Sequence, residues 1–215
     1  MAAFHRRGWT TELVVCDNNS TDGTARIARA AGAVVVFEPV NQISRARNAG
    51  AAAASGDWFI FVDADSRPTA ELCADTADAI ESGRVLAGGC TLRMDERFFW
   101  VDVVTSGWNG LSRMTGWVAG AFIFCSAGAF REIGGFNEQF YVAEELDLSK
   151  RLKMLARKRQ QTMVILTRHP LETSARKARL YGPGTIVRFF LMALFSPRRT
   201  LIHRDLCRPS YAGHP

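Results

Sequence analysis

Apolar runs alternate with helix-like segments through the first part of the chain. Residues 12–16 and 33–37 are short apolar runs, and the segment between them, 25–31, is helix-like. An Ala-rich segment, 43–55, then leads into 58–62, an unbroken run of Trp, Phe, Ile, Phe and Val. Such a run is typical of a central strand covered on both faces. This order of strand, helix and strand predicts an α/β protein with a parallel sheet.

The later part of the chain continues the alternation. The pattern predicts helices over 71–82 and 143–158 and strands over 85–92, 120–125 and 162–167. The 143–158 segment is acidic at its start and basic at its end, which the helix dipole favours. Residues 95–118 are rich in aromatic side chains, and no element is predicted there.

Residues 186–195 form a strongly apolar run near the C-terminus. Ten residues are too few to span a bilayer. Two interpretations remain open, a helix packed on the core or an interfacial helix on an anionic membrane surface. We therefore divide the chain into a domain over 1–170 and a basic C-terminal extension with an apolar helix over 171–215.

Basic residues gather in the C-terminal part of the chain. The net charge is +6, yet residues 150–215 hold 15 Lys and Arg against 2 Asp and Glu, while the first 149 residues hold 12 against 19. A basic tail on an acidic body indicates contact with anions such as phospholipid head groups, substrate phosphates or nucleic acid. The tail lacks the interleaved aromatic and glycine residues of stacking platforms, so we expect no nucleic-acid partner.

The five cysteines are an odd number and include no CxxC pair. This usage favours a reducing cytosol over a disulfide framework or a zinc cluster. The N-terminus has no apolar run after its basic residues, and no 18-residue apolar stretch is present, so neither a signal peptide nor a transmembrane helix is predicted. We expect a cytoplasmic protein, with the basic tail as a candidate contact to the inner face of the membrane.

Two carboxylates, Asp63 and Asp65, follow directly after the 58–62 run. In open α/β sheets, ligands bind outside the carboxyl ends of the strands. Carboxylates two residues apart at such an end can both turn toward one hard cation, and Mg²⁺ and Mn²⁺ prefer oxygen ligands. A diphosphate leaving group needs such a cation. The placement after a buried strand therefore predicts a Mg²⁺ or Mn²⁺ site, although solvated loop residues share this pattern.

Two further polar segments are candidates for binding and catalysis. The loop 17–24 is dense in turn residues; Thr21 or Asp22 could cap the next helix, or the loop could hold a nucleobase. The segment 134–138 precedes an acidic cluster that contains Glu144 and Glu145. The helix dipole alone favours acidic residues at a helix start, and a carboxylate there could also serve as a general base.

The order of these segments resembles that of the family 2 glycosyltransferases, inverting enzymes of the GT-A fold. The matching segments, in the family's order, are Val15–Thr24, Asn41–Ala49, Gly56–Asp65, Gly134–Glu138 and Glu144–Leu148. The resemblance implies a GT-A-like, Rossmann-type mixed sheet, mostly parallel, with helices on both faces. It also implies metal-dependent transfer of a sugar from a nucleotide-diphosphate sugar, with a UDP-sugar favoured, to an acceptor hydroxyl.

The resemblance implies a role for each matched position on the donor side. Asp17 and Asn18 match the loop that holds the nucleobase, and Arg47 and Asn48 match a segment that lines the nucleotide pocket. Asp63 matches the carboxylate on the ribose and metal side.

For the metal, Asp65 matches the main ligand, and His169 is a candidate third ligand because some GT-A enzymes use a His near the end of the domain. A loop position beside Pro is the alternative for His169. Arg176, in the same downstream region, could clamp the diphosphate, or lie on the surface as solvated charge.

On the acceptor side, Glu145 falls where the family has its catalytic Asp. Glu145 is one methylene longer, so Glu144 and Asp147 are alternatives for the base. Gly135 and Phe136 match the loop beneath the acceptor site.

The family normally begins with a strand that ends in a Pro-x-x-Asn-Glu-like sequence, central in the sheet, whereas this sequence starts inside the helix that follows it. Loss of that strand would expose apolar neighbours and leave backbone groups unpaired. The alternative function is therefore a non-catalytic or truncated GT-A remnant that binds a nucleotide or a partner.

Overall fold

The structure is a computed structural model, and it describes residues 1–96, 99–118, 120–141 and 143–174. The apolar segment 186–195, Arg176 and all but the first residues of the expected extension 171–215 lie outside the described residues. Every helix within the described ranges is too short or too polar to cross a bilayer.

The elements follow the predicted order. In sequence they are α1 (Ala2–His5), β1 (Val14–Asp17), α2 (Thr24–Ala30), β2 (Val34–Phe37), α3 (Ile43–Ala53), β3 (Trp58–Val62), β4 (Ser66–Arg67), α4 (Ala70–Glu81), β5 (Val85–Met94), α5 (Phe99–Thr115), β6 (Phe122–Ser126), α6 (Ala127–Glu132), α7 (Glu144–Lys158) and β7 (Thr162–Thr173). Each predicted element is confirmed within a few residues, except that β7 runs on past residue 167 and that α5 occupies the region where no element was predicted.

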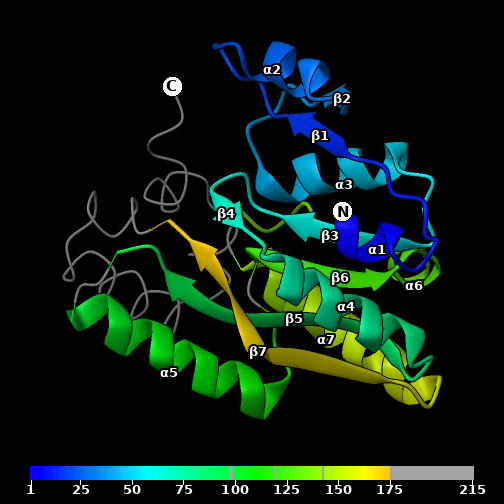
Figure 1. Cartoon of the computed structure of the whole chain (residues 1–215), viewed down its shortest axis with the longest axis vertical. Helices are drawn as coiled ribbons and strands as arrows, with labels where there is room; N and C mark the ends of the chain where they lie inside the picture. Colours follow the sequence, from blue (N-terminus) through cyan, green and yellow to red (C-terminus); the bar gives the residue numbers. More distant parts are fainter. Residues whose placement is uncertain (97–98, 119, 142, 175–215) are drawn as a thin grey trace.

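The strands form two sheets (Figure 1). One sheet is the parallel pair β1–β2, and the other has the order β3-β6-β5-β7-β4. In the larger sheet only β5 and β7 pair in parallel, while β3–β6, β5–β6 and β4–β7 are antiparallel. The expected mixed α/β architecture is confirmed, but the expectation of a mostly parallel sheet is wrong, because an apolar run marks a buried strand without encoding its direction.

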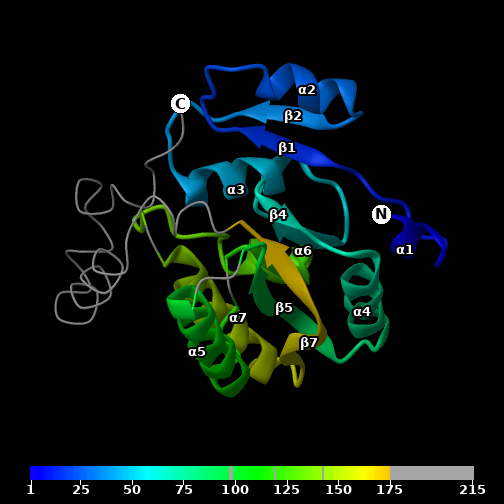
Figure 2. The same cartoon turned by 60° about the vertical axis from the view of Figure 1, so that its left-hand side comes forward.

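Helices cover both faces of the five-stranded sheet, as predicted (Figures 1 and 2). On one face Leu148 and Leu152 of α7 pack against Ile123 of β6, and on the other face Leu72 of α4 lies in a cluster with Phe124. Successive residues of β6 thus enter different clusters, because side chains alternate along a strand. This position between two layers explains why β6 is apolar at nearly every residue.

No strand pairing joins β1 to β3 within the described residues. Within the described ranges, β1 pairs only with β2, and β3 pairs only with β6. The two parts are connected through Glu12, whose Oε1 accepts hydrogen bonds from the backbone N–H groups of Ser55 (2.6 Å) and Gly56 (2.8 Å). Glu12 precedes β1, and the two donors precede β3, so this carboxylate fixes the starts of both strands.

Candidate functional site

Arg47 of α3 connects three segments that are far apart in the sequence. Its Nη2 lies 2.7 Å from Oδ1 of Asp63 and donates to the carbonyl of Gly120 at 2.8 Å, and its Nη1 donates to Oε1 of Glu144 at 3.0 Å. The guanidinium also lies over the ring of Phe136, 5.2 Å from its centroid. The side chain of Arg47 is only 10% exposed. The structure therefore brings the carboxyl end of β3 and the N-terminal end of α7 to one place.

The three candidate base residues on α7 have different surroundings. Glu144 is 4% exposed, and burial together with the nearby charge of Glu145 raises its pKa to about 8, against the opposing effect of Arg47. Asp147 accepts a hydrogen bond from Nε of Arg151 at 2.7 Å within the helix. Glu145 is half-buried. Its carboxyl carbon lies near Gly120, where an added Cβ would stand 3.6 Å away. Of the three, Glu145 combines partial exposure with a position beside the Arg47 network.

The two candidate metal ligands lie in a tight turn after β3. The N–H of Ser66 donates to the carbonyl of Asp63 at 3.0 Å, and the N–H of Asp63 donates to the carbonyl of Ala121 at 3.2 Å. The turn leaves Asp65 exposed, while Asp63 is half-buried and paired with Arg47. Two carboxylate donors with one open side fit a hard cation that keeps further positions for phosphate and water.

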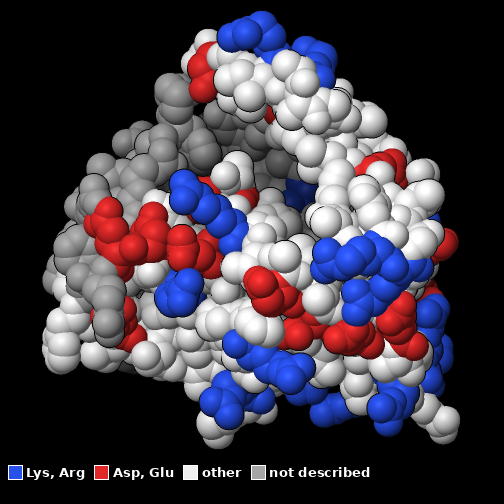
Figure 3. Space-filling view, in the orientation of Figure 1, with Lys and Arg blue, Asp and Glu red and all other residues white. Residues whose placement is uncertain are grey.

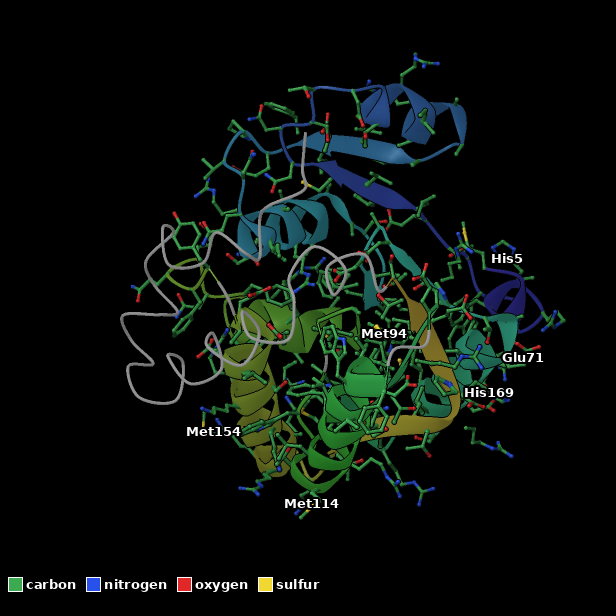
Figure 4. All side chains as sticks on the ribbon, turned by 90° about the vertical axis from the view of Figure 1, so that its left-hand side faces the viewer. His5, Glu71, Met94, Met114, Met154 and His169 are labelled. Carbon is green, nitrogen blue, oxygen red and sulfur yellow. The ribbon has the colours of Figure 1, made fainter. Side chains whose placement is uncertain are left out.

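His169 does not join this pair. Its Nδ1 lies 2.9 Å from Oδ2 of Asp75 in α4, and Figure 4 shows the labelled His169 beside α4, near Glu71. In the part of the chain that the structure describes, no three His, Cys, Asp or Glu side chains are grouped to hold a metal. The prediction of His169 as a third ligand is wrong, because β7 passes α4 at this residue.

The loop after β1 is built from hydrogen bonds of its own side chains. Asp17 is buried, and its Oδ1 accepts from the N–H of Ser20 at 2.9 Å. Nδ2 of Asn18 donates to the carbonyls of Glu38 (3.0 Å) and Val40 (2.6 Å). Oδ1 of Asn18 also accepts from the N–H of Gln42 at 3.0 Å. These bonds hold the β1 loop against the connection to α3, and the expected place of Asn18 in a nucleobase-binding loop stays a prediction.

The N-cap residue of α2 is Gly23, so neither Thr21 nor Asp22 occupies the expected capping position. Oδ1 of Asp22 still accepts from the N–H of Thr24, the first residue of α2, at 2.8 Å. A ligand role for Asp17, at the end of β1, stays an open prediction.

Asn48 and the 134–138 loop form one unit. Oδ1 of Asn48 accepts from the N–H of Phe136, and its Nδ2 donates to the carbonyl of Phe136, both at 2.9 Å. Gly135 has φ +71, and an added Cβ would stand 2.7 Å from Oδ1 of Asn48, so glycine is required there. Asn48 thus clamps this loop, and its expected place in the lining of the nucleotide pocket stays a prediction.

The same unit contains the two residues expected in the loop beneath the acceptor site. Phe136 is 2% exposed, and its ring packs edge-on against Phe61 and lies beneath Arg47. This buried ring supports the guanidinium from below, and Gly135 allows the close approach of Asn48. The position of this loop relative to an acceptor stays a prediction.

Sequence reasoning missed two neighbours on α3. Gln42 is 3% exposed, and its Nε2 donates to the carbonyls of Glu138 (2.7 Å) and Phe140 (3.1 Å). Arg45 pairs with the carboxylates of Glu38 and Glu138, each at 3.0 Å. Their spacing on an otherwise Ala-rich helix was the available signal, because residues three apart share a helix face.

The surface is hollowed between the part formed by β1, α2 and β2 and the rest of the molecule, and both acidic and basic atoms are visible in the depth of the hollow (Figure 3). Asp17 is the last residue of β1, which belongs to the first part, and Asp63 directly follows β3, which belongs to the rest of the molecule. The arrangement can therefore offer oxygen ligands, a fixed cation and a half-buried carboxylate to a polar ligand.

Solved structures share this fold. A mannosyltransferase from Pyrobaculum calidifontis, in complex with GDP-Man and Mn²⁺, matches with a TM-score of 0.64 and 18% identity over 93% of this chain and 59% of that one. Glucosyl-3-phosphoglycerate synthase from Mycobacterium tuberculosis, with Mn²⁺, UDP-glucose and phosphoglyceric acid, has a TM-score of 0.57 and 21% identity over 91% and 71%. TarS from S. aureus, with UDP-GlcNAc, has a TM-score of 0.60 and 16% identity over 92% and 60%.

A curated relative is similar over a shorter stretch. A TPR repeat-containing protein of Synechococcus elongatus is 36% identical over 77 residues, which is 35% of this chain and 19% of the relative. The chain thus spans about a fifth of that relative and less than two thirds of the mannosyltransferase and of TarS. The model of glycosyl transferase family 2 matches residues 6–133, more than half of the chain. With the fold and this match in agreement, the chain belongs to glycosyl transferase family 2.

Proposed function

We propose that the protein transfers a sugar from a nucleotide-diphosphate sugar to an acceptor hydroxyl, with inversion at the anomeric carbon. The observation that carries this proposal is the Arg47 network, which joins the turn of Asp63 and Asp65 to the start of α7. The carboxylates of Asp63 and Asp65, which would bind a cation, and the carboxylate at the start of α7, which would act as a base, then belong to one site. Two proteins of similar fold were solved with Mn²⁺ and a nucleotide sugar, GDP-Man in one and UDP-glucose in the other, which supports a nucleotide-sugar donor.

On the donor side, Asp65 and Asp63 would hold Mg²⁺ or Mn²⁺. Bound there, the cation would neutralise charge that develops on the diphosphate leaving group. Asp65 is exposed and free to turn toward the ligand, while Arg47 keeps Asp63 in place. Asp17, buried at the end of β1, is the candidate partner for the nucleoside.

On the acceptor side, Glu145 is the proposed general base. It would take the proton of the acceptor hydroxyl as the oxygen forms its bond to the anomeric carbon, and the bond from that carbon to the diphosphate oxygen breaks on the opposite side. Glu144 is 4% exposed and is therefore less suited to reach a hydroxyl than the half-buried Glu145. Asp147, which accepts a hydrogen bond from Arg151, is the alternative base.

The proposal is tested with a panel of nucleotide sugars and Mn²⁺, read by donor hydrolysis and by thermal shift. We expect Asp65→Ala to abolish turnover. We expect Glu145→Gln to lower turnover by roughly 10²–10⁴-fold, the usual scale for loss of a general base, with donor binding kept. Near-normal turnover of Glu145→Gln would remove Glu145 from this role.

A second candidate function is a module that binds a nucleotide without transferring a sugar. The separate sheets favour it, because β1 and β3 carry no pairing with each other within the described ranges. The same panel separates the two functions, since a binding module gives a metal-dependent thermal shift without hydrolysis for any donor. Association of the C-terminal extension with an anionic membrane remains a separate prediction, for which binding to anionic liposomes is the assay.

A further inference from the structure

The outward face of α5 is apolar along its whole length. The helix contacts the sheet through Asn109, whose side-chain amide pairs with the N–H and the carbonyl of Leu92, both at 2.9 Å. On the opposite side, Phe99 is 86% exposed, Val103 56% and Met114 87%. An outward helix face is normally polar, and exposed apolar patches of this kind often mark interaction sites. No segment among the described residues covers this one. Figure 4 shows α5 on the viewer's side, with the labelled Met114 at one end.

Two glycines lie in the same stripe. Gly107 and Gly110 are exposed, and an added Cβ at either would meet no atom within 4 Å. Nothing within the described chain therefore requires glycine at these positions, although glycine weakens a helix interior. Glycine at these two positions would, however, allow another backbone or side chain to approach this face of the helix closely.

We propose that this face of α5 is the interface between two copies of the chain, with the two helices antiparallel. A two-fold axis between residues 106 and 107 sets Phe99 against Met114 of the second copy and Val103 against its Gly110. Each valine then fills the space that a glycine leaves open, and small residues, Ser106 and Gly107, meet at the centre. The stripe is thus complementary to itself, as an isologous interface must be.

The flanks of the stripe obey the same symmetry. In an antiparallel pair, residues on one flank of a helix face the same flank of its partner. Val104 and Leu111, 44% and 43% exposed, lie on one flank. Val104 of one copy then lies beside Leu111 of the other, at heights along the helix axis that differ by about 3 Å. Asp102 and Arg113 lie on the other flank with the same spacing, so each carboxylate faces a guanidinium of the second copy. A membrane surface would select neither the paired glycines nor this charge pairing.

A single pair of 17-residue helices is smaller than a standard stable interface. We therefore expect a weak, reversible dimer. Sedimentation of the full chain over a range of concentrations measures its dissociation constant. The key variants are Val103→Gly, Gly110→Val and the double variant with both changes. The double variant exchanges the positions of the valine and the glycine, so that each valine again faces a glycine of the second copy and the composition of the helix is unchanged. Circular dichroism and thermal unfolding check that each variant keeps its fold.

Each single variant is expected to weaken the dimer about tenfold or more, on the scale of buried interface side chains, and the double variant to recover most of that loss. A matched control is Ile27→Gly, which removes a 62% exposed β-branched residue from α2 and should leave association unchanged. A chain that sediments as a monomer at every concentration overturns the proposal. So does a double variant no better than the single ones, or a face that binds anionic liposomes with no self-association.

Discussion

Replacement of Arg47 by Met is the substitution that we expect to destabilise the proposed site most. Met keeps an unbranched apolar stem that reaches about as far as Nε of the arginine, and it removes the guanidinium with all its hydrogen bonds. The carbonyl of Gly120 then loses its donor, and the carboxyl groups of Asp63 and Glu144 lose their shared hydrogen-bond partner. Breaking a buried ion pair by removing one partner costs about 3–5 kcal/mol, and an unsatisfied buried acceptor alone costs about 1–3 kcal/mol.

Two features of the structure place the expected loss at the low end. Glu144, with its pKa raised to about 8, can stay protonated at pH 7. The side chain of Asp63 is 40% exposed, so water replaces part of the lost interaction. We expect Arg47→Met to lower the free energy of unfolding by about 3 kcal/mol, which is a fall of roughly 6–12 °C in Tm for a domain of this size. Urea unfolding, followed by circular dichroism, measures the loss.

Arg131→Met is the matched control. Arg131 also lies over a phenylalanine ring, that of Phe59, at 5.2 Å, and donates to the carbonyl of Ala54. It is exposed, however, and pairs with no carboxylate among the described residues. Its loss should cost below about 1 kcal/mol. Equal losses in the two variants would refute the reasoning, since the ring contact alone would then account for Arg47.

Two further predictions concern the loop and helix around this arginine. Gly135→Ala should destabilise the protein more than Gly134→Ala. Both residues have positive φ, +71 and +79, but only at Gly135 would an added Cβ meet another atom, at 2.7 Å. Equal unfolding midpoints for the two variants would count against the Asn48 clamp. For Glu144, a folded-state pKa above the value of 4.5 in the unfolded chain means that stability falls as pH rises from about 4.5 to about 8. Glu144→Gln should remove that decline, and parallel stability curves for both proteins across this window would contradict it.

Strand β3 could be predicted to the residue, because an unbroken apolar run between Gly56 and Asp63 leaves one interpretation. Helix α5 could not be predicted, because its outward stripe is as apolar as its inward face, so no helical period separates them. The parallel or antiparallel direction of the strands could not be predicted for a similar reason, since β6 is buried on both faces whichever way it runs.

Within the site, the acidic strand end at Asp63 and the acidic start of α7 could each be recognised in the local sequence, and the structure shows that Arg47 joins them. The partners of amides and rings could not be predicted. Asn48 bonds to Phe136, 88 residues away, and His169 to Asp75, 94 residues away. A polar side chain takes whichever partner the packed fold brings within about 3 Å, and that partner is not visible in local sequence.

The central claim is that the turn of Asp63 and Asp65 holds a cation against the diphosphate of the donor. Electron paramagnetic resonance of Mn²⁺ with UDP or GDP labelled with ¹⁷O on the diphosphate tests it directly. We predict a protein-bound Mn²⁺ signal that ¹⁷O broadens with at least one nucleotide. The signal should be lost in Asp65→Ala and kept in Asp57→Ala, an exposed carboxylate before the opposite end of the same strand. A bound signal that survives Asp65→Ala, or one that the label does not broaden, would contradict the claim.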